Sequence, residues 1–422
     1  MIAEKLFLRK LENVRHGSVE LIAPSGRYVF GDPASDLTAT WVVQNSRFFS
    51  RILFGGNDGG GDSYVDGDWW SPDLVSLIRL AVRNMATTLP SGSRLSSPLS
   101  AVTRIAFRIS HRLRANTISG SRRNIADHYD LSNDFFRLFL DREMVYSCAM
   151  FVNETDSLED AQRHKLDHIC RKLNLKPGDR VLEIGTGWGA FAEVAATLYS
   201  CRVTTTTISR QQHAAAKERF DRLGEAGRRI ELLFDDYRNL RGMYDKIVSI
   251  EMFEAVGLKY YDAFFGTCDR LLAPHGSMLL QTVTMNEQEF RHYHRSADWI
   301  QRRIFPGSEL SCLSEVLRSV GRSTSLTLSH LEDIGPHYAL TLNEWRRRFL
   351  DARTEVLRLG FDERFVRMWD YYLAYCVGAF RERYIGDAQL LLTKMHNPTA
   401  VLGDPGPVQG TVDIYSAREL GF

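Results

Sequence analysis

The sequence predicts a doubly wound α/β domain that follows a smaller α+β domain. Helical and strand-like segments alternate from about residue 158 to residue 285, and the strand-like runs are continuously apolar. Such runs are typical of a parallel sheet that helices cover on both faces. The first 70 residues differ, because glycine, proline and asparagine break their β-like runs into short pieces.

Three consecutive regions are expected along the 422 residues. Residues 1–90 are predicted to form an N-terminal accessory domain for contact with lipid, a membrane or a second subunit. A Ser/Pro/Gly-rich stretch begins a basic connector at 91–120. Residues 121–422 are left for the α/β domain, with a helical cover from about residue 340 to 395.

Two local features of the accessory domain can be predicted from composition. The run GGNDGGGDSYVDGDWW (55–70) is expected to be a loop, since it is rich in glycine and aspartate. Its acids lack the ligand spacing of a calcium loop. A helix is expected over 71–90, with Ser71 as N-cap and Pro72 in the first turn.

The cysteine content and the hydropathy pattern exclude several classes of protein. The six cysteines form no CxxC pair and no Cys/His cluster, so neither a zinc site nor a disulfide framework is expected. No apolar run is long enough to span a bilayer, and the N-terminus has no apolar core of a signal peptide. A cytoplasmic protein without a bound metal is therefore the expectation.

Charge is distributed unevenly although the net charge is only +1. No acidic residue lies between Asp73 and Asp127, whereas the same interval holds nine arginines. Arg104, Arg108 and Arg112 follow helical spacing, so a basic stripe is expected. The stripe is compatible with a solvated helix face or linker, with an anionic membrane surface, or with nucleic acid.

The α/β domain is expected to contain nine alternating segments. Helices are predicted over 158–175, 189–199, 211–224 and 260–273, and strands over 180–185, 201–209, 230–236, 244–253 and 276–285.

A glycine-rich turn follows the first of these strands. In VLEIGTGWGAF, Gly185, Gly187 and Gly189 stand where the chain passes from strand to helix, which allows close approach of a ligand. The spacing is not the G-x-G-x-x-G of dinucleotide sites, and no acid ends the second strand. Glu183 before the glycines and Asp236 after the third strand instead match S-adenosylmethionine-dependent methyltransferases.

Several further stretches together resemble one family, the cyclopropane-fatty-acyl-phospholipid synthases and the related mycolic acid methyltransferases. The likeness covers about residues 115–400 and includes HYDLSNDFFRLFLDREMVYSCAMF, TISRQQ, DDYR, EMFEAVG, DWIQRRIFPG and HYALTLNEW. The N-terminal region is similar in kind to the extra domain of the phospholipid-acting members. The resemblance implies a class I methyltransferase fold.

The resemblance implies methyl transfer to a cis double bond of a phospholipid acyl chain. The alkene attacks the donor, and loss of a proton from the new methyl group closes a cyclopropane ring. A dry aromatic slot would protect the carbocation, for which Phe253 and Trp299 are the candidates. In the family the base is a bound bicarbonate. Its implied ligands are Cys148, Glu254, Gln281, the backbone of Val283, and Tyr338.

The resemblance also identifies positions for the methyl donor. The glycines would face its amino-acid part, and Asp236 would lie near the adenine. The matching positions are Tyr146, Ser147, Gly185, Thr186, Gly187, Thr207, Gln212, Asp236 and Tyr237.

The resemblance assigns Cys148 to the anion pocket, a role that its neighbours in VYSCAMF do not indicate by themselves. No basic partner adjoins it, and methyl transfer to an alkene needs no covalent enzyme intermediate. It is expected to form a wall of the anion pocket rather than a nucleophile.

Two departures from the family pattern affect the product. Gln281 stands where many members have histidine, and Ala255 follows the glutamate where histidine is common. Glutamine can hold an anion but cannot take a proton near neutral pH. The alternative product is a methyl- or methylene-branched acyl chain made with the same cofactor and lipid.

Other functions remain open on the sequence alone. They are a non-catalytic lipid-binding protein on this fold and a methyltransferase for RNA or a small molecule. No RNA-binding module is evident, so nucleic acid is not expected as a partner. The expected partners are unsaturated phospholipid and the anionic inner face of the membrane, with a homodimer suggested by the family.

Overall fold

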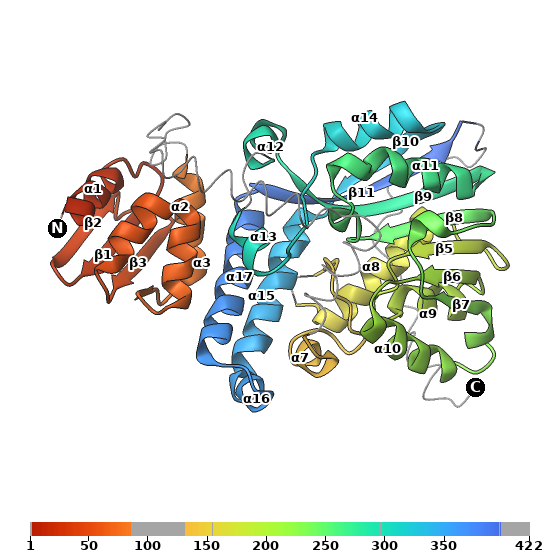
Figure 1. The fold of residues 1–422 in the computed structure, drawn as a ribbon, viewed down its shortest axis with the longest axis horizontal. Helices are drawn as coiled ribbons and strands as arrows, with labels where there is room; N and C mark the ends of the chain where they lie inside the picture. Colours follow the sequence, from red (N-terminus) through yellow and green to blue (C-terminus); the bar gives the residue numbers. More distant parts are fainter. Residues whose placement is uncertain (1, 86–130, 154, 295–297, 396, 398–422) are drawn as a thin grey trace. The chain divides into compact units, whose positions relative to one another are not determined.

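The structure is a computed structural model that describes residues 2–85, 131–153, 155–294, 298–395 and 397 (Figure 1). The arginine stripe and the connector expected at 91–120 lie outside these residues. The described residues form two compact units. Unit 1 takes its residues from Met1–Ala115, Gln288–Gly307 and Tyr338–Gly386, and unit 2 from Asn116–Glu287, Ser308–His337 and Asp387–Phe422.

These units do not follow the expected sequence boundaries. Residues 338–386, expected within the α/β domain, group with the N-terminal segment. The three-region division therefore stays a prediction.

Unit 1 contains a four-stranded sheet with the order β2-β1-β3-β4. A tight turn joins β1 and β2 into an antiparallel pair, whereas β3 runs parallel to β1. The N-terminal elements are α1 (Ile2–Leu11), β1 (Ser18–Ala23), β2 (Gly26–Gly31), β3 (Thr38–Val43), α2 (Arg47–Val65), β4 (Trp69–Trp70) and α3 (Leu74–Arg83). An α+β domain at the N-terminus is thus confirmed.

Residues 55–65 of the glycine/aspartate run expected as a loop are part of helix α2, so the prediction is wrong for them. α2 is kinked at Gly56, where φ is 57° and ψ is −141°. Its first turn buries Phe48 and Phe49, and its last turn buries Tyr64 and Val65. Burial of these apolar ends outweighs the low helix propensity of glycine.

The helix expected over 71–90 begins later than predicted. α3 starts at Leu74, and its N-cap is Asp73, whose carboxylate accepts a hydrogen bond of 3.0 Å from the N–H of Ser76. Aspartate is a strong N-cap, so it replaces the expected Ser71.

Later helices complete unit 1. Arg79 and Arg83 of α3 both donate to Glu382 at the end of α17, each at 2.6 Å. The later helices, whose residues lie wholly or mostly in unit 1, are α12 (Glu287–Tyr293), α13 (Trp299–Arg303), α15 (Gly335–Asp351), α16 (Arg353–Arg358) and α17 (Glu363–Arg381).

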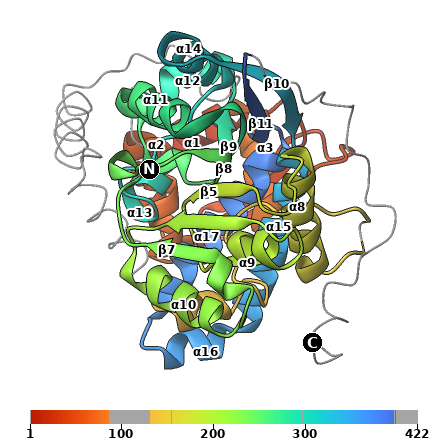
Figure 2. The ribbon, with the colours of Figure 1, turned by 90° about the vertical axis from the view of Figure 1, so that its right-hand side faces the viewer.

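Unit 2 contains a seven-stranded sheet with the order β10-β11-β9-β8-β5-β6-β7 (Figures 1 and 2). The pairs from β9 to β7 are parallel, as predicted. The strands are β5 (Arg180–Ile184), β6 (Arg202–Thr206), β7 (Ile230–Leu233), β8 (Tyr244–Ile250), β9 (Leu272–Met285), β10 (Leu326–Asp333) and β11 (Ile385–Lys394). The helices are α7 (Asn133–Arg137), α8 (Leu158–Lys172), α9 (Ala190–Thr197), α10 (Arg210–Asp221), α11 (Tyr261–Leu271) and α14 (Leu313–Ser323).

Both faces of this sheet are buried. Val181 and Leu182, neighbours on β5, belong to two different apolar clusters, and so do Leu279 and Leu280 on β9. One cluster includes side chains of α11 and α14, and the other includes side chains of α8, α9 and α10. Successive side chains of a strand point to opposite faces, so both faces are covered and the doubly wound fold is confirmed.

The helical tail expected to residue 395 is wrong in its last part. The chain forms β11 over Ile385–Lys394, which lies between β9 and β10 and pairs with β10 in antiparallel fashion. Eight of its ten residues are buried. The run LLLT suits a buried strand, although Asp387 and Gln389 interrupt its apolar pattern.

Candidate functional site

The glycine turn after β5 provides an open stretch of backbone. Gly185, Gly187 and Gly189 all have positive φ, at 105°, 53° and 92°. No heavy atom of the described residues outside the adjoining chain lies within 4 Å of a Cβ placed on Gly187. The turn leads directly into α9, whose N-terminal N–H groups favour a polar ligand.

A buried hydrogen-bond chain holds this turn in place. Thr205 on β6 donates to the Glu183 carboxylate at 2.6 Å, and its hydroxyl lies 2.7 Å from that of Thr186. Burial raises the pKa of Glu183 to about 8. The side chain of Glu183 therefore points into the protein and fixes the turn.

The other residues of the sheet that are predicted to contact the methyl donor follow β6 and β7. Thr207 donates to the side chain of Gln212 at 2.9 Å. Asp236 accepts two hydrogen bonds of 2.7 Å from the guanidinium of Arg238. The ring of Tyr237 packs against Phe264 at a centroid distance of 5.3 Å. Because β5, β6 and β7 are parallel neighbours, these positions share one edge of the sheet with the glycine turn.

Tyr146 and Ser147 reach this edge from the segment before α8. Tyr146 contacts the ring of Phe136 at 5.4 Å, and Phe136 contacts Trp188 of the glycine turn at 5.2 Å. Ser147 accepts a hydrogen bond of 2.8 Å from Lys165, a fully buried lysine on α8. The predicted donor positions of unit 2 thus gather around the glycine turn.

Cys148 is fully buried and its thiol is satisfied. The Sγ–H lies 3.2 Å from the carbonyl of Ala149 and 3.6 Å from that of Ile334. Burial, together with the carboxylates of Asp387 and Glu251, raises the pKa of the thiol well above its usual value. A nucleophilic cysteine reacts as the thiolate, and the surroundings of Cys148 disfavour the thiolate.

The N–H of Cys148 donates to a carboxylate that sequence reasoning missed. Its acceptor is Glu251 Oε1, at 2.7 Å, directly after β8. Gln281 on β9 donates to the same oxygen at 2.7 Å and to Asp387 Oδ2 on β11 at 3.3 Å. The side chain of Gln389 donates to Gln281 Oε1 at 3.0 Å, which fixes the orientation of the Gln281 amide.

Glu254 lies beside this group. Its Oε1 accepts hydrogen bonds from the hydroxyl of Thr282 at 2.9 Å and from the N–H of Val283 at 2.5 Å. Its buried Oε2 has no hydrogen-bond partner among the described residues. Burial and the nearby Glu251 raise the pKa of Glu254 to about 7. The structure thus brings Cys148, Gln281, Val283 and Glu254 together, as predicted.

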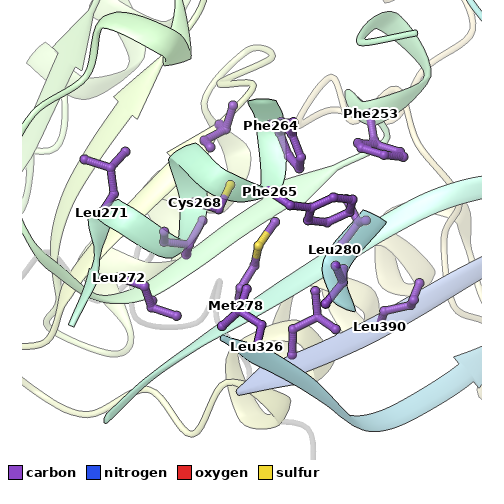
Figure 3. Close-up of a cluster of buried hydrophobic side chains, with 14 of the residues drawn as sticks. Phe253, Phe264, Phe265, Cys268, Leu271, Leu272, Met278, Leu280, Leu326 and Leu390 are labelled. Carbon is purple, nitrogen blue, oxygen red and sulfur yellow. The ribbon is translucent and has the colours of Figure 1, made fainter. Parts of the chain in front are cut away.

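Three other predicted residues lie elsewhere. Phe253 is fully buried among Tyr261, Phe264 and Phe265, within the apolar cluster on one face of the sheet (Figure 3). Trp299 and Tyr338 belong to unit 1. Roles in the substrate slot and the anion pocket stay predictions for these residues.

Trp299 and Tyr338 are packed within unit 1. The indole N–H of Trp299 donates to Asp62 at 3.1 Å, and its ring lies 4.8 Å from that of Tyr371. Tyr338 packs against Phe380 at 4.6 Å.

Glu251, Asp387 and Lys165 are the members of the site that the sequence did not reveal. Glu251 stands inside EMFEAVG at the end of a predicted strand, so its position was a usable indication. Asp387 was assigned to a helix, which concealed its place beside Gln281. Lys165 looked like an ordinary polar residue of an amphipathic helix.

The described residues offer neither a metal site nor a membrane-spanning helix. No group of His, Cys, Asp and Glu side chains there could hold a metal ion. No helix in this part of the chain is both long and apolar enough to cross a bilayer.

Comparisons with known proteins agree with this arrangement. Residues 117–390 match the family model described as mycolic acid cyclopropane synthetase. The chain is 38% identical over 377 residues to the cyclopropane-fatty-acyl-phospholipid synthase of Escherichia coli, covering 89% of this chain and 92% of that protein. It is 36% identical over 355 residues to tuberculostearic acid methyltransferase UfaA1 of Mycobacterium tuberculosis, covering 82% and 81%.

Solved structures give a similar result for part of the chain. The cyclopropane synthase MmaA2 from Mycobacterium tuberculosis superposes with a TM-score of 0.61 at 33% identity, covering 65% of this chain and 98% of that one. The mycolic acid cyclopropane synthase CmaA1, solved with S-adenosylhomocysteine (SAH), has a TM-score of 0.60 at the same identity and coverage of this chain.

Proposed function

Since the chain belongs to the mycolic acid cyclopropane synthetase family, we propose that it adds a methylene bridge to the cis double bond of unsaturated phospholipid acyl chains. The chain is an S-adenosylmethionine-dependent C-methyltransferase. What is proposed is the lipid class and the cyclopropane product.

The extent of the likeness to the phospholipid synthase carries the proposal. That likeness covers 89% of this chain, whereas the curated mycolate enzyme MmaA2 matches only 64% of it. The additional part includes N-terminal sequence of the accessory domain. A phospholipid substrate therefore fits the whole chain better than a mycolate substrate does.

The residues around the glycine turn suit the methyl donor. Gly187 leaves space beside its backbone, and the turn is fixed by Glu183 and Thr205. Thr207 and Gln212 present hydroxyl and amide groups at the end of β6. When bound, S-adenosylmethionine supplies an electrophilic methyl group, and the buried surroundings of Cys148 would keep water from the carbocation.

Bicarbonate, expected as the base, does not fit the described site. The N–H groups of Cys148 and Val283 and the amide of Gln281 already donate to Glu251 and Glu254. An added anion would find these donors taken and two carboxylates beside it.

A methyl- or methylene-branched product is the second candidate. It is favoured by the 36% identity to a protein named as a methyltransferase and by Gln281, which cannot take a proton. Both products add one carbon to the lipid, so mass alone does not separate them.

The test uses the purified full-length chain, donor labelled in its methyl group, and vesicles of unsaturated phospholipid. Label is expected in the acyl chain, with high-field cyclopropyl protons in the NMR spectrum of the product. Methyl-doublet or vinylidene signals would instead establish the second candidate. Absence of label from every unsaturated phospholipid would contradict both.

Contact with the cytoplasmic face of the membrane is also proposed, with unit 1 as the contacting part. Phe54 on α2 and Ile2 on α1 have exposed side chains, at 83% and 81%. Large apolar side chains exposed to this extent suit insertion between lipid headgroups. A homodimer stays a prediction.

A further inference from the structure

The carboxylate of Glu251 occupies a position that is prepared for an anion. It accepts hydrogen bonds from the N–H of Cys148 and the amide of Gln281, both at 2.7 Å, and it also hydrogen-bonds Asp387. Two of these partners, Cys148 and Gln281, are residues whose expected role was to bind a separate anion. The chain thus supplies its own carboxylate to these donors.

The charge balance of the buried group leaves no place for a second anion. Burial and the nearby Glu251 raise the pKa of Asp387 well above its usual value, so Asp387 is the protonated partner of the pair. Lys165 is fully buried near Glu251 and Asp387, and burial lowers its pKa although both carboxylates favour its charged form. Adding bicarbonate would place another negative charge beside Glu251 and Glu254 in a region of low dielectric constant.

The backbone also singles out Glu251. Its φ is 47°, a left-handed conformation that is unusual for a residue with a side chain. It directly precedes Met252, whose Cβ would lie 3.1 Å from a Cβ added to Gly185 of the glycine turn. Glu251 is therefore next in sequence to the residue that touches the predicted donor site.

On the basis of the proposed function, we propose that Glu251 fills the anion position and is the base of the reaction, which therefore proceeds without bicarbonate. The alkene electron pair forms the bond to the methyl carbon, and the carbon–sulfur bond breaks with its pair on sulfur. The neighbouring lipid carbon becomes a carbocation. Glu251 takes a proton from the transferred methyl carbon, and the freed C–H pair bonds to the carbocation and closes the ring. The electron-deficient cation draws on this C–H bond and makes its proton very acidic, so a carboxylate is a sufficient base. In the methylene-branched alternative, a hydride first moves from the methylated carbon to the cation, and loss of the methyl proton then forms the double bond.

Two substitutions distinguish the effect of losing the carboxylate from the effect of emptying the space that it fills. Glu251→Gly suits the left-handed backbone and opens the position, so the variant is expected to fold. Glu251→Gln keeps the space filled without a base. Asp269→Asn is the control, because it neutralises a carboxylate on α11 that accepts hydrogen bonds from Ser325 and Lys394.

Product formation is measured in buffer freed of carbon dioxide, with and without added bicarbonate. The unchanged protein and Asp269→Asn are expected to be active in both buffers. Both Glu251 variants should lose activity by about 100-fold or more without bicarbonate. Bicarbonate should restore activity to Glu251→Gly alone.

A bicarbonate requirement of the unchanged protein, or retained activity of Glu251→Gln, would overturn the proposal. Loss of activity in Glu254→Gln but not in the Glu251 variants would move the role to Glu254. Binding of ¹³C-labelled bicarbonate, followed by carbon NMR, decides the matter independently of turnover. Only Glu251→Gly should bind it. If no variant and no unsaturated lipid gives product, the proposed function fails while this binding result still stands.

Discussion

At the scale of single residues, ionisable groups are buried throughout the site. Glu183, Asp387 and Lys165 all lie in unit 2 with almost no exposed surface. Each is linked by hydrogen bonds or charge to a neighbour at the carboxyl edge of the sheet. Such groups hold the geometry of the site at a cost in stability.

Glu183 makes that cost measurable. Its pKa is about 8 in the folded protein against 4.5 as the ordinary value, so between these values the folded state keeps a proton that the unfolded state releases. Its contribution to stability is complete below the lower value and is lost as the pH rises through about 8. Glu183→Gln cannot ionise. Relative to it, the unchanged protein should lose roughly 2–4 kcal/mol of unfolding free energy between about pH 5 and about pH 8.

Urea unfolding at several pH values measures this difference. Glu225→Gln, at an exposed glutamate of unit 2, provides the control and should follow the unchanged protein. Parallel stability curves for Glu183→Gln and the unchanged protein would contradict the expectation.

Part of the site could be predicted at this scale. The family resemblance placed Cys148, Glu254, Gln281 and Val283 together, because a resemblance transfers positions one by one. The resemblance could not show that Gln281 hydrogen-bonds both Glu251 and Asp387, because these contacts depend on the order of the strands in the sheet. Residues on β8, β9 and β11 meet only through the sheet.

At the scale of elements, α2 shows how close packing can require glycine inside a helix. A Cβ on Gly61 would lie 2.7 Å from Trp299 Nε1 and 2.8 Å from a ring carbon of Tyr371. Aspartates at four-residue spacing on the same helix meet arginines of unit 1, with Asp58 bound to Arg302 at 2.5 Å. The glycines and aspartates that indicated a loop therefore contribute to the packing of a helix.

Substitutions in α2 test this view. Gly61→Ala should lower the unfolding free energy by about 1–3 kcal/mol, because the indole and phenol rings must move. Gly55→Ala is the matched control, since no heavy atom outside the adjoining chain lies within 4 Å of its added Cβ. It should be neutral or stabilising by up to about 1 kcal/mol. Equal effects of the two substitutions in urea unfolding would contradict the packing argument.

The regular alternation of helices and strands in unit 2 was predictable, because buried parallel strands have continuous apolar sequences. β10 was not recognised, since five of its eight residues are exposed and its pattern is mixed. β11 was assigned to the preceding helical segment. Local pattern does not reveal that a distant strand enters the sheet.

At the scale of the whole molecule, membrane contact through unit 1 can be tested with full-length protein. Phe54→Asp should reduce co-sedimentation with anionic phospholipid vesicles, because an exposed aromatic side chain is replaced by a charge that lipid repels. Met243→Asp removes an exposed apolar residue of unit 2 and should bind as the unchanged protein does. Equal binding of all three proteins would remove Phe54 from the contact.

The position of β11 has a consequence for biosynthesis. This strand is the last described element of the chain, yet it lies inside the sheet between β9 and β10. The sheet cannot close until residues near Lys394 have left the ribosome, and until then β9 exposes an unpaired edge. Asp387 arrives with the same strand, so a nascent chain that stops before β11 lacks both the closed sheet and the partner of Glu251. Premature truncation products should therefore be substrates for chaperones and proteases rather than partly active enzymes.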